Sequence, residues 1–567
     1  MQFSNHNRKE VTNHLSATTF DLVVIGGGIT GAGIALDAAS RGLKVALLEK
    51  GDFASGTSSK STKLIHGGLR YLKQFDFWLV KEVGSERAIV HQLAPHLVLP
   101  EKMLLPLIEN GSYGKWLTSV GLKVYDILAQ VTGEDKRQML EKKEALALEP
   151  LLPKKVLKGA GYYAEYRTDD ARLTIENIKT AVSKGATALN YAKVTGFLYR
   201  EDQVAGVAVA DQLSGATFEI NASYVINAAG PWVDELREVN QSKNGKRLHL
   251  TKGVHLVFPY EKLPVKQSVY FDIPDGRMMF AIPRGKVTYV GTTDTNFDKD
   301  KDHPHTTLAD AIYLISAVNN MFPKINLDLE DIVSSWAGLR PLIHEEGKGA
   351  SELSRKDEIF TSPSGLVSIA GGKLTGYRKM AERVLDKVVE KMTPKAKAAL
   401  KNCYTDKIPL MGNGFKNSKA VQKYLAAVQN ILEQDGLSRQ EAWHLVTNYG
   451  KQTEEILKNY KLQKEALGQQ NTSEASLNEK QLRTALVLAE LEFGCANEMV
   501  TSPEDFYIRR TGRLYFDIDS ISLTQEAVYD YFEKNMSWGA EQLKNSQKSL
   551  RLAMEEHSDF SMDRAYQ

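Results

Sequence analysis

The sequence is poor in cysteine and has no large excess of charge. Its two cysteines, Cys403 and Cys495, match no spacing typical of a metal or redox site, so no metal site is predicted. Their scarcity favours a reducing compartment. The net charge of +2 at pH 7 gives no reason to expect a nucleic acid as partner.

Long apolar runs are also missing. The longest uncharged run, 22–36, has 15 residues, five of them glycine, and is too short to span a bilayer. Residues 1–19 are polar and of mixed charge, without the apolar core of a secretory signal. We therefore expect no membrane-spanning segment, while peripheral attachment to a membrane stays compatible with the sequence.

What is present is typical of a globular protein with more than one domain: 567 residues, 42% hydrophobic and 25% charged. We expect a disordered tail over 1–19, an α/β region over 20–395 and a C-terminal helical domain over 396–567. Strands are predicted at 188–197, 204–208, 224–227, 287–290 and 366–370, and helices at 418–433, 438–449, 480–492 and 524–538.

The most distinctive segment is 20–50, FDLVVIGGGITGAGIALDAASRGLKVALLEK. It predicts a strand, a glycine-rich turn, a helix of small residues and a second strand that ends in an acid. Gly26 permits a tight turn, Gly28 permits close approach of a pyrophosphate, and Gly31 permits close packing of the helix on the sheet. The pyrophosphate would lie at the helix N-terminus, next to Ile29 and Thr30.

Glu49 completes this unit. It lies 21 residues beyond Gly28, at the distance from which a carboxylate accepts hydrogen bonds from ribose hydroxyls. The segment therefore predicts a dinucleotide site in a doubly wound α/β fold. The alternative is a glycine-rich turn between a strand and a helix in some other α/β fold.

A second segment, 55–71 (SGTSSKSTKLIHGGLRY), follows closely and is dense in hydroxyls, glycines and cations. Ser58, Ser59 and Lys63 have the chemistry to bind pyrophosphate or ribitol oxygens, and the run from His66 offers close backbone approach to a planar ring. Alone, such a segment is usually an ordinary loop. Its position directly after a dinucleotide turn favours a role in the same site.

Two predicted strands decide the kind of dinucleotide. The segment 188–197 would arrive beside the nucleotide with Val194 near the adenine, and 224–230 (YVINAAG) ends in the small residues Ala229 and Gly230. By itself each is an ordinary core strand. Their order after the glycine turn is that of flavoproteins with two dinucleotide-binding regions, which favours FAD over NAD.

A third group is scattered but chemically coherent. Two arginines and a lysine, Arg340, Arg355 and Lys373, form a natural phosphate clamp, because guanidinium binds phosphate oxygens through paired hydrogen bonds. Any one of them alone would be read as a surface charge. His255 lies among apolar neighbours, as a core histidine would, but is the one obvious base with a pKa near neutrality.

These segments resemble the FAD-dependent glycerol-3-phosphate dehydrogenases. The resemblance covers most of the chain and is carried by DLVVIGGGITGAGIALDAASRG, TSSKSTKLIHGGLRYL, TDDARL, NAAGPW, KGVH, GTTD, GLRPL and GGKLTGYRKMAE, with Arg509-Arg510-Thr511 near the C-terminus. It implies a non-covalently bound FAD and oxidation of sn-glycerol 3-phosphate to dihydroxyacetone phosphate. The implied architecture is a Rossmann-like FAD domain, an interleaved sheet-based substrate domain and a C-terminal helical domain.

The resemblance also implies residue roles. The cofactor-binding residues are Gly26, Gly28, Ile29, Thr30, Gly31, Glu49, Thr57, Ser58, Ser59, Lys63, Leu64, His66, Gly67, Gly68, Val194, Ala229, Gly230, Lys373, Leu374 and Thr375. The substrate-binding residues are Arg70, Tyr71, His255, Thr293, Arg340, Arg355 and Lys373, with Thr292 left open as an alternative to Thr293. The catalytic set is His255 as base, Arg340 on the phosphate and Lys373 against developing negative charge on the flavin or the substrate oxygen.

The resemblance indicates the electron acceptor less directly than it indicates the cofactor and the substrate. Related glycerophosphate oxidases carry an insertion between their cofactor and substrate segments, for which this chain has little room. That favours a dehydrogenase passing electrons to a membrane quinone, in the cytoplasm and peripherally attached to the inner face of the membrane, with a homodimer left open. The alternatives are an oxidase using O₂, a flavin amine oxidase of the glycine or sarcosine type, and a non-catalytic FAD-binding scaffold.

Overall fold

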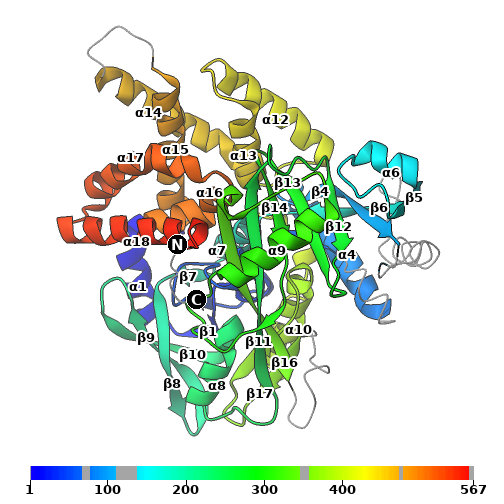
Figure 1. Ribbon diagram of the computed structural model, residues 1–567. Helices are drawn as coiled ribbons and strands as arrows, with labels where there is room; N and C mark the ends of the chain where they lie inside the picture. The colour runs from blue at the N-terminus through cyan, green and yellow to red at the C-terminus, as the bar shows by residue number, and fades with distance from the viewer. Residues whose placement is uncertain are drawn as a thin grey trace.

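The computed structural model describes residues 2–66, 77–109, 111, 137–344, 357–470 and 477–560. Two β-sheets form the centre of the molecule. The helices drawn in yellow to red, α12–α18 (residues 418–558), lie along the upper and left edge of the view, and strands β8 and β9 (residues 192–211) project at the bottom (Figure 1).

The first sheet is built around β1 (Phe20–Ile25). This strand pairs in parallel with β2 (Val45–Leu48) on one side and with β10 (Thr217–Asn227) on the other. The parallel sheet continues through β7 (Thr187–Leu189) beyond β2 and β18 (Val367–Ala370) beyond β10. β1 and β2 are almost wholly buried and apolar, as parallel strands with covered faces are.

Helix α2 (Ile29–Arg41) packs against both α7 (Asp170–Ser183) and α10 (Tyr377–Val389) beside this sheet. α2 begins directly after the glycine turn and ends at Gly42, whose φ of 108° suits a residue without a side chain. The N-terminus of α2 therefore lies at the carboxyl end of β1, where open α/β sheets bind ligands. The predicted doubly wound fold is confirmed.

Strands β8 (Ala192–Arg200) and β9 (Gln203–Asp211) extend antiparallel from β10. The single strand expected over 188–197 is divided into β7 and β8. The chain turns between them at Tyr191, whose φ is 52°. The side chain of Asn190 holds the turn by donating to Asp52 Oδ1 and to the carbonyl of Met499.

The second sheet carries long antiparallel strands. β11 (Arg247–Pro259) pairs with β16 (Ser334–His344) over residues 247–257 and with β14 (Val287–Gly291) on its other side. In this register His255 is opposite Trp336, and Thr251 is opposite Arg340. The remaining strands are β3 (Leu64–Ile65), β4 (Leu99–Ile108), β5 (Gln138–Glu141), β6 (Leu157–Arg167), β12 (Ser268–Asp272), β13 (Met278–Arg284) and β15 (Thr295–Asn296), while β17 (Glu358–Thr361) closes the first sheet.

The N-terminal segment differs from the expected disordered tail. Residues 8–17 form helix α1 (Arg8–Ala17), and its Val11 and Leu15 are buried in the same apolar cluster as β1. The Arg8 guanidinium donates to Asp211 Oδ1 at 2.8 Å and to the carbonyl of Asn190 at 2.8 Å. Two apolar residues one turn apart are a short signal that the polar composition of the segment conceals.

The C-terminal part is helical. The helices expected over 418–433, 438–449, 480–492 and 524–538 correspond to α12, α13, α15 and α17. In the described part of the chain, no helix combines the length and the apolar character needed to cross a membrane. The helices not yet given bounds are α4 (Phe77–Leu93), α6 (Lys142–Leu148), α8 (Val233–Val239), α9 (Leu308–Met321), α11 (Pro394–Ala398), α12 (Ser418–Glu433), α13 (Arg439–Tyr449), α14 (Thr453–Gln470), α15 (Glu479–Asn497), α16 (Arg513–Phe516), α17 (Ile518–Met536) and α18 (Ala540–Ser558).

Buried ion pairs join the C-terminal helices to the first sheet and its helices. Asp52, just after β2, accepts two hydrogen bonds from the Arg510 guanidinium, at 2.8 and 2.9 Å, and one from Arg509. On α7, Arg172 donates to both carboxylate oxygens of Glu498, at 2.6 and 2.9 Å. Asp52, Arg510 and Glu498 are fully buried, so each depends on its partner to offset the loss of water.

We expect Arg510→Met to destabilise the protein by about 3–5 kcal/mol, because it leaves the buried Asp52 carboxylate short of a partner. Burial opposes ionisation of Asp52, but the two arginines outweigh it and lower its pKa to about 2. The stabilising contribution is therefore present above a pH of about 4 and is lost as the pH falls towards 2. Denaturant unfolding of both proteins at pH 7 and pH 3 measures this, and a difference that did not shrink on acidification would contradict it.

Candidate active site

A cavity of about 480 Å³ opens at the N-terminus of α2. Its wall includes the glycine turn, the acid after β2 and the small residues after β10; we call it the glycine-turn cavity. Among its lining residues are Gly26, Gly28, Ile29, Thr30, Glu49, Thr57, Ser58, Val194, Ala229, Gly230, Lys373 and Leu374.

Two glycines of the turn have no room for a side chain. Gly26 has a φ of 112°, and a Cβ there would lie 2.5 Å from the carbonyl oxygen of Ala228. A Cβ on Gly31 would lie 1.8 Å from the carbonyl oxygen of Gly26. Gly31 does not line the cavity but lets the first turn of α2 approach the strand, so that the helix N-terminus reaches the cavity wall.

The carboxylate of Glu49 is held by the same turn. Its Oε2 accepts from the backbone N–H of Gly27 at 2.7 Å, and its Oε1 accepts from Gly51 at 2.9 Å. Burial raises the pKa of Glu49, against the effect of these two hydrogen bonds. Ser58 Oγ accepts from the N–H of Ile29 at 2.9 Å and so covers the start of α2. A glycine-walled cavity with an acid at the far strand fits a dinucleotide.

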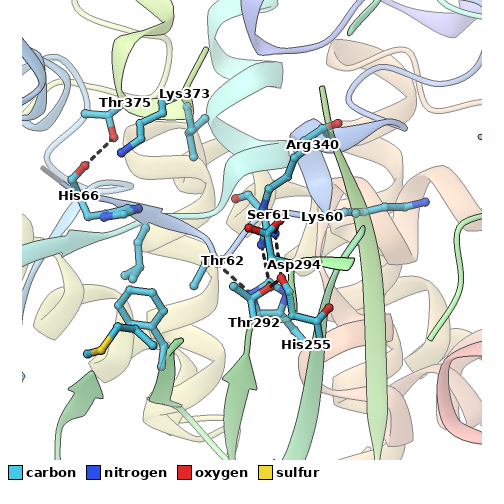
Figure 2. Close-up of a pocket in the computed structure, with 18 of the residues that line it drawn as sticks. Lys60, Ser61, Thr62, His66, His255, Thr292, Asp294, Arg340, Lys373 and Thr375 are labelled. Carbon is cyan, nitrogen blue, oxygen red and sulfur yellow. Dashed lines mark hydrogen bonds and ion pairs between the residues drawn. The ribbon is translucent and has the colours of Figure 1, made fainter. Parts of the chain in front are cut away.

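A second cavity, of about 630 Å³, lies against the second sheet and is continuous with the first through Thr57, Ser61, Lys373 and Leu374. We call it the sheet cavity. Figure 2 shows His66, Lys373 and Thr375 on one side of it and Arg340, Asp294, Thr292 and His255 on the other.

Arg340 is fixed on the polar side. Its guanidinium donates to the carbonyl of Thr293 at 2.8 Å, to Asp294 Oδ1 at 3.2 Å and to Thr292 Oγ1 at 2.7 Å. Gly253 makes room for it, since a Cβ there would lie 2.2 Å from Arg340 Nη2. The Arg340 side chain keeps 31% of its surface exposed and lines the cavity, so it can also contact a ligand there.

The two threonines left open by the sequence have different partners. Thr293 Oγ1 accepts from the N–H of Val254 at 3.0 Å and donates to the carbonyl of Lys252 at 3.1 Å, so its hydroxyl is used by the main chain of β11. Thr292 Oγ1 instead faces Arg340. The geometry favours Thr292, where the sequence set named Thr293.

His255 lies at the base of the cavity with only 1% of its surface exposed. Its ring stacks on Trp336, with centroids 4.7 Å apart and 12° between the planes, and its Nε2 is 3.0 Å from Thr62 Oγ1. Burial, followed by the charges of Arg340 and Lys63, lowers the pKa of His255 well below its usual value. The imidazole is therefore neutral at physiological pH, as a proton acceptor must be.

The opposite side of the sheet cavity is partly aromatic. Phe280 stacks on Tyr270 with centroids 4.3 Å apart and meets the ring of His66 edge-on at 6.0 Å. Burial, followed by the charges of Lys373 and Arg87, lowers the pKa of His66 to about 3, so this ring is also neutral. A planar, partly apolar group would fit between these rings and the end of the glycine-turn cavity.

Some predicted site residues lie elsewhere. Lys63 is buried, with Nζ donating to Asp170 Oδ1 and to the carbonyl of Ser59 at 3.0 Å, and neither Lys63 nor Ser59 is among the described residues that line these two cavities. The buried aspartate was not recognised from the sequence as a partner of Lys63. The predicted residues that line the sheet cavity are Thr57, Leu64, His66, His255, Thr293, Arg340, Lys373, Leu374 and Thr375, and those outside the described residues are Gly67, Gly68, Arg70, Tyr71 and Arg355.

Sequence reasoning missed several residues at the same place. Thr62 and Trp336 contact His255, and Asp294 contacts Arg340. A signal existed for each, because Thr62 belongs to the hydroxyl-rich segment, Trp336 lies two residues before the motif GLRPL, and Asp294 is the last residue of the motif GTTD. The sequence does not show which of these side chains meet; the position of Trp336 beside His255, for example, follows from the pairing of β11 with β16.

Two sequence families match the chain. Residues 21–378 match the family described as FAD-dependent oxidoreductase, and residues 403–543 match the C-terminal domain of alpha-glycerophosphate oxidase. The first match contains most of both cavities. The second covers the helical region from which Glu498, Arg509 and Arg510 reach the first sheet.

Several individual proteins are similar over their whole length. The aerobic glycerol-3-phosphate dehydrogenase of Bacillus subtilis is 50% identical, over 96% of this chain and 96% of its own. That of Staphylococcus haemolyticus is 47% identical over 98% of each chain. A solved structure from Bacillus halodurans, glycerol-3-phosphate dehydrogenase complexed with FAD, is 42% identical with a TM-score of 0.82, covering 98% of this chain and 99% of that one.

Proposed function

The chain belongs to the FAD-dependent oxidoreductases and is a member of their glycerol-3-phosphate dehydrogenase family, and from this we propose how its residues carry out the oxidation. The substrate is sn-glycerol 3-phosphate and the product dihydroxyacetone phosphate. One observation supports the proposal most: a fixed arginine and a neutral histidine line the cavity that continues from the glycine turn.

The glycine-turn cavity would hold the ADP half of FAD, with the pyrophosphate at the start of α2 and the ribose at Glu49. When bound, FAD would supply the two-electron acceptor, taking the hydride from C2 of the substrate at flavin N5. Lys373 and Leu374 line both cavities, so they would lie where the flavin ring meets the substrate.

Arg340 would bind the substrate phosphate through its guanidinium fork, with Arg355, Arg70 and Tyr71 assigned to the same task by the family resemblance. Anchoring the phosphate fixes C2 relative to the base and so converts a chance encounter into a reactive geometry. His255 would accept the proton of the C2 hydroxyl. Lys373 would stabilise the negative charge that develops during the transfer.

We assign the electron acceptor as a quinone at the membrane surface, with the protein attached peripherally. The family name of the relatives, aerobic glycerol-3-phosphate dehydrogenase, supports this assignment. The competing acceptor is O₂. An amine oxidase of the glycine or sarcosine type is less favoured, because its carboxylate substrate has no need of a set of cations around one cavity.

The test is anaerobic mixing of the purified yellow protein with glycerol 3-phosphate, followed by air or a soluble quinone. Bleaching of the flavin band, with fast reoxidation by quinone alone, is expected. Fast reoxidation by air would make the protein an oxidase. No bleaching by glycerol 3-phosphate, with bleaching by glycine or sarcosine, would overturn the substrate assignment.

Arg340→Ala is expected to raise the KM for glycerol 3-phosphate about 10- to 100-fold with a smaller change in kcat, because it removes charge-assisted hydrogen bonds worth about 1.5–3 kcal/mol. Steady-state kinetics with the soluble quinone measures both constants. Arg340→Lys is the matched variant. It keeps the positive charge but loses the planar fork of donors, so its KM should lie between that of the wild type and that of Arg340→Ala. An unchanged KM with a reduced kcat would show that Arg340 acts on the reacting atoms instead.

A further inference from the structure

The C-terminal helical domain contacts the active site from behind His255. The indole of Trp336 stacks on the imidazole and has three further ring neighbours: Tyr515 and Phe516 of α16, at 5.2 and 5.8 Å between centroids, and Tyr289 of β14 at 5.5 Å. Trp336 is fully buried, so its position is determined by these contacts. The ring against which His255 rests is thus supported by a part of the chain more than 170 residues away in sequence.

The same indole also fixes the other partner of His255. Trp336 Nε1 donates to the carbonyl of Ser61 at 3.1 Å, and Tyr289 Oη donates to the carbonyl of Thr62 at 3.1 Å. These bonds hold the short segment whose Thr62 hydroxyl meets His255 Nε2. Trp336 therefore controls both the plane of the imidazole and the position of its hydroxyl partner.

Only one edge of the His255 ring is available to a substrate. Its Nδ1 is buried without a hydrogen-bond partner, so a group in the sheet cavity cannot reach it. The proton of the substrate C2 hydroxyl must therefore be accepted by Nε2, the ring nitrogen that contacts the Thr62 hydroxyl. A small rotation of the ring would move Nε2 relative to the cavity, and displacements of about 1 Å in reacting groups cost up to about 100-fold in rate.

The aromatic pair in α16 is anchored on both sides. Ser334 Oγ of β16 donates to the carbonyl of Leu514 at 2.8 Å. The guanidinium of Arg284 lies over the ring of Phe516 at 3.9 Å, a cation–π contact between the second sheet and α16. The first contact fixes α16 to β16, the strand that carries Trp336 two residues along from Ser334, and the second fixes it to β13.

We propose that the C-terminal domain is a positioning part of the active centre, in which Tyr515 and Phe516 hold Trp336 so that the imidazole of His255 presents Nε2 to the substrate. The inference rests on the assignment of His255 as the base in the proposed function. It gives the helical domain a role in the chemistry beyond its contribution to stability, although Phe516 itself lines neither the sheet cavity nor the glycine-turn cavity.

The test compares Phe516→Leu with Phe532→Leu in the full-length holoenzyme. Phe532 is a buried phenylalanine of the same domain that stacks on Trp538 instead of Trp336. Both variants should lower the melting temperature. Phe516→Leu should also slow flavin reduction at saturating glycerol 3-phosphate about 10-fold with KM unchanged, while Phe532→Leu should keep it within about 2-fold of wild type.

A second readout is independent of turnover. The emission of Trp336, obtained as the difference between each protein and the same protein carrying Trp336→Phe, should change in Phe516→Leu and stay unchanged in Phe532→Leu. Thr62→Val should repeat the slow reduction and Thr62→Ser should restore it, because serine keeps the hydroxyl. Equal rates for Phe516→Leu and Phe532→Leu would overturn the inference.

The two levels of assignment fail in different ways. His255→Ala is measured in parallel. If it is slow and Phe516→Leu is not, the positioning role is wrong while the base assignment stands. If His255→Ala reduces flavin at the wild-type rate, the base assignment fails and the positioning role fails with it.

Discussion

His255→Ala is expected to slow flavin reduction at saturating glycerol 3-phosphate by about 10²- to 10⁴-fold, the contribution usual for a positioned general base. Substrate binding should change little, because the phosphate contacts assigned to Arg340 remain. Stopped-flow bleaching of the flavin band under anaerobic conditions measures the rate, and its dependence on substrate concentration gives the affinity.

The pH profile provides an independent check. Burial, followed by the charges of Arg340 and Lys63, lowers the pKa of His255 well below its usual value, and protonation would remove the base. The wild-type rate should therefore hold through pH 6.5 and fall only at lower pH, and the residual rate of His255→Ala should lack this acid limb.

A matched variant separates chemistry from packing. His255→Gln keeps a polar side chain beside Thr62 and leaves a smaller void against Trp336 than alanine does. It should be as slow as His255→Ala but more stable to heat. Reduction at the wild-type rate in both variants would require another base or none.

The second large effect is expected from Gly31→Ala. Its Cβ would lie 1.8 Å from the carbonyl oxygen of Gly26, an overlap that only movement of the helix or the turn can relieve. Either movement displaces the N-terminus of α2 from the cavity wall where the pyrophosphate would bind. The variant should be purified without yellow colour or should fail to fold, and absorbance at the flavin band against protein concentration measures the cofactor content.

Gly196→Ala is the control for this prediction. Gly196 lies in β8 of the same region and has no atom within 4 Å of its would-be Cβ. It should keep its full FAD content and a melting temperature close to that of the wild type. A Gly31→Ala protein that retained stoichiometric FAD would contradict the prediction, because it would show that FAD still binds when α2 is pushed away from the glycine turn.

How far the sequence could predict the molecule depends on how local each feature is. The glycine turn and Glu49 lie within one continuous unit whose spacing is set by strand and helix geometry, so both could be placed in advance. The helix over 418–433 could be delimited to the residue because its apolar periodicity begins and ends clearly. The division of segment 188–197 into two strands could not be predicted, because the turn at Asn190 is held by Asp52 and Met499, which are distant in the sequence.

The candidate site shows the same limit. Arg340, His255 and Lys373 could be grouped by chemistry, and they line one cavity. The partner of the Lys63 side chain could not be found from the sequence, because a cation near a glycine turn suggests a phosphate, whereas Asp170, to which Lys63 donates, lies 107 positions along the chain. The stack of His255 on Trp336 depends on strand register, which periodicity alone does not give.

We expect the ion pairs of Asp52 with Arg510 and of Arg172 with Glu498 to make the two halves of the chain depend on each other for folding. A fragment ending near residue 395 would keep a complete glycine turn yet expose two charged groups shaped for partners that it no longer has. The helical half on its own would expose Arg510 and Glu498, the partners of those two groups. The chain should consequently melt in one cooperative transition, and insertions or fusions are better placed at exposed loops than at the junction that the sequence composition marks as a boundary.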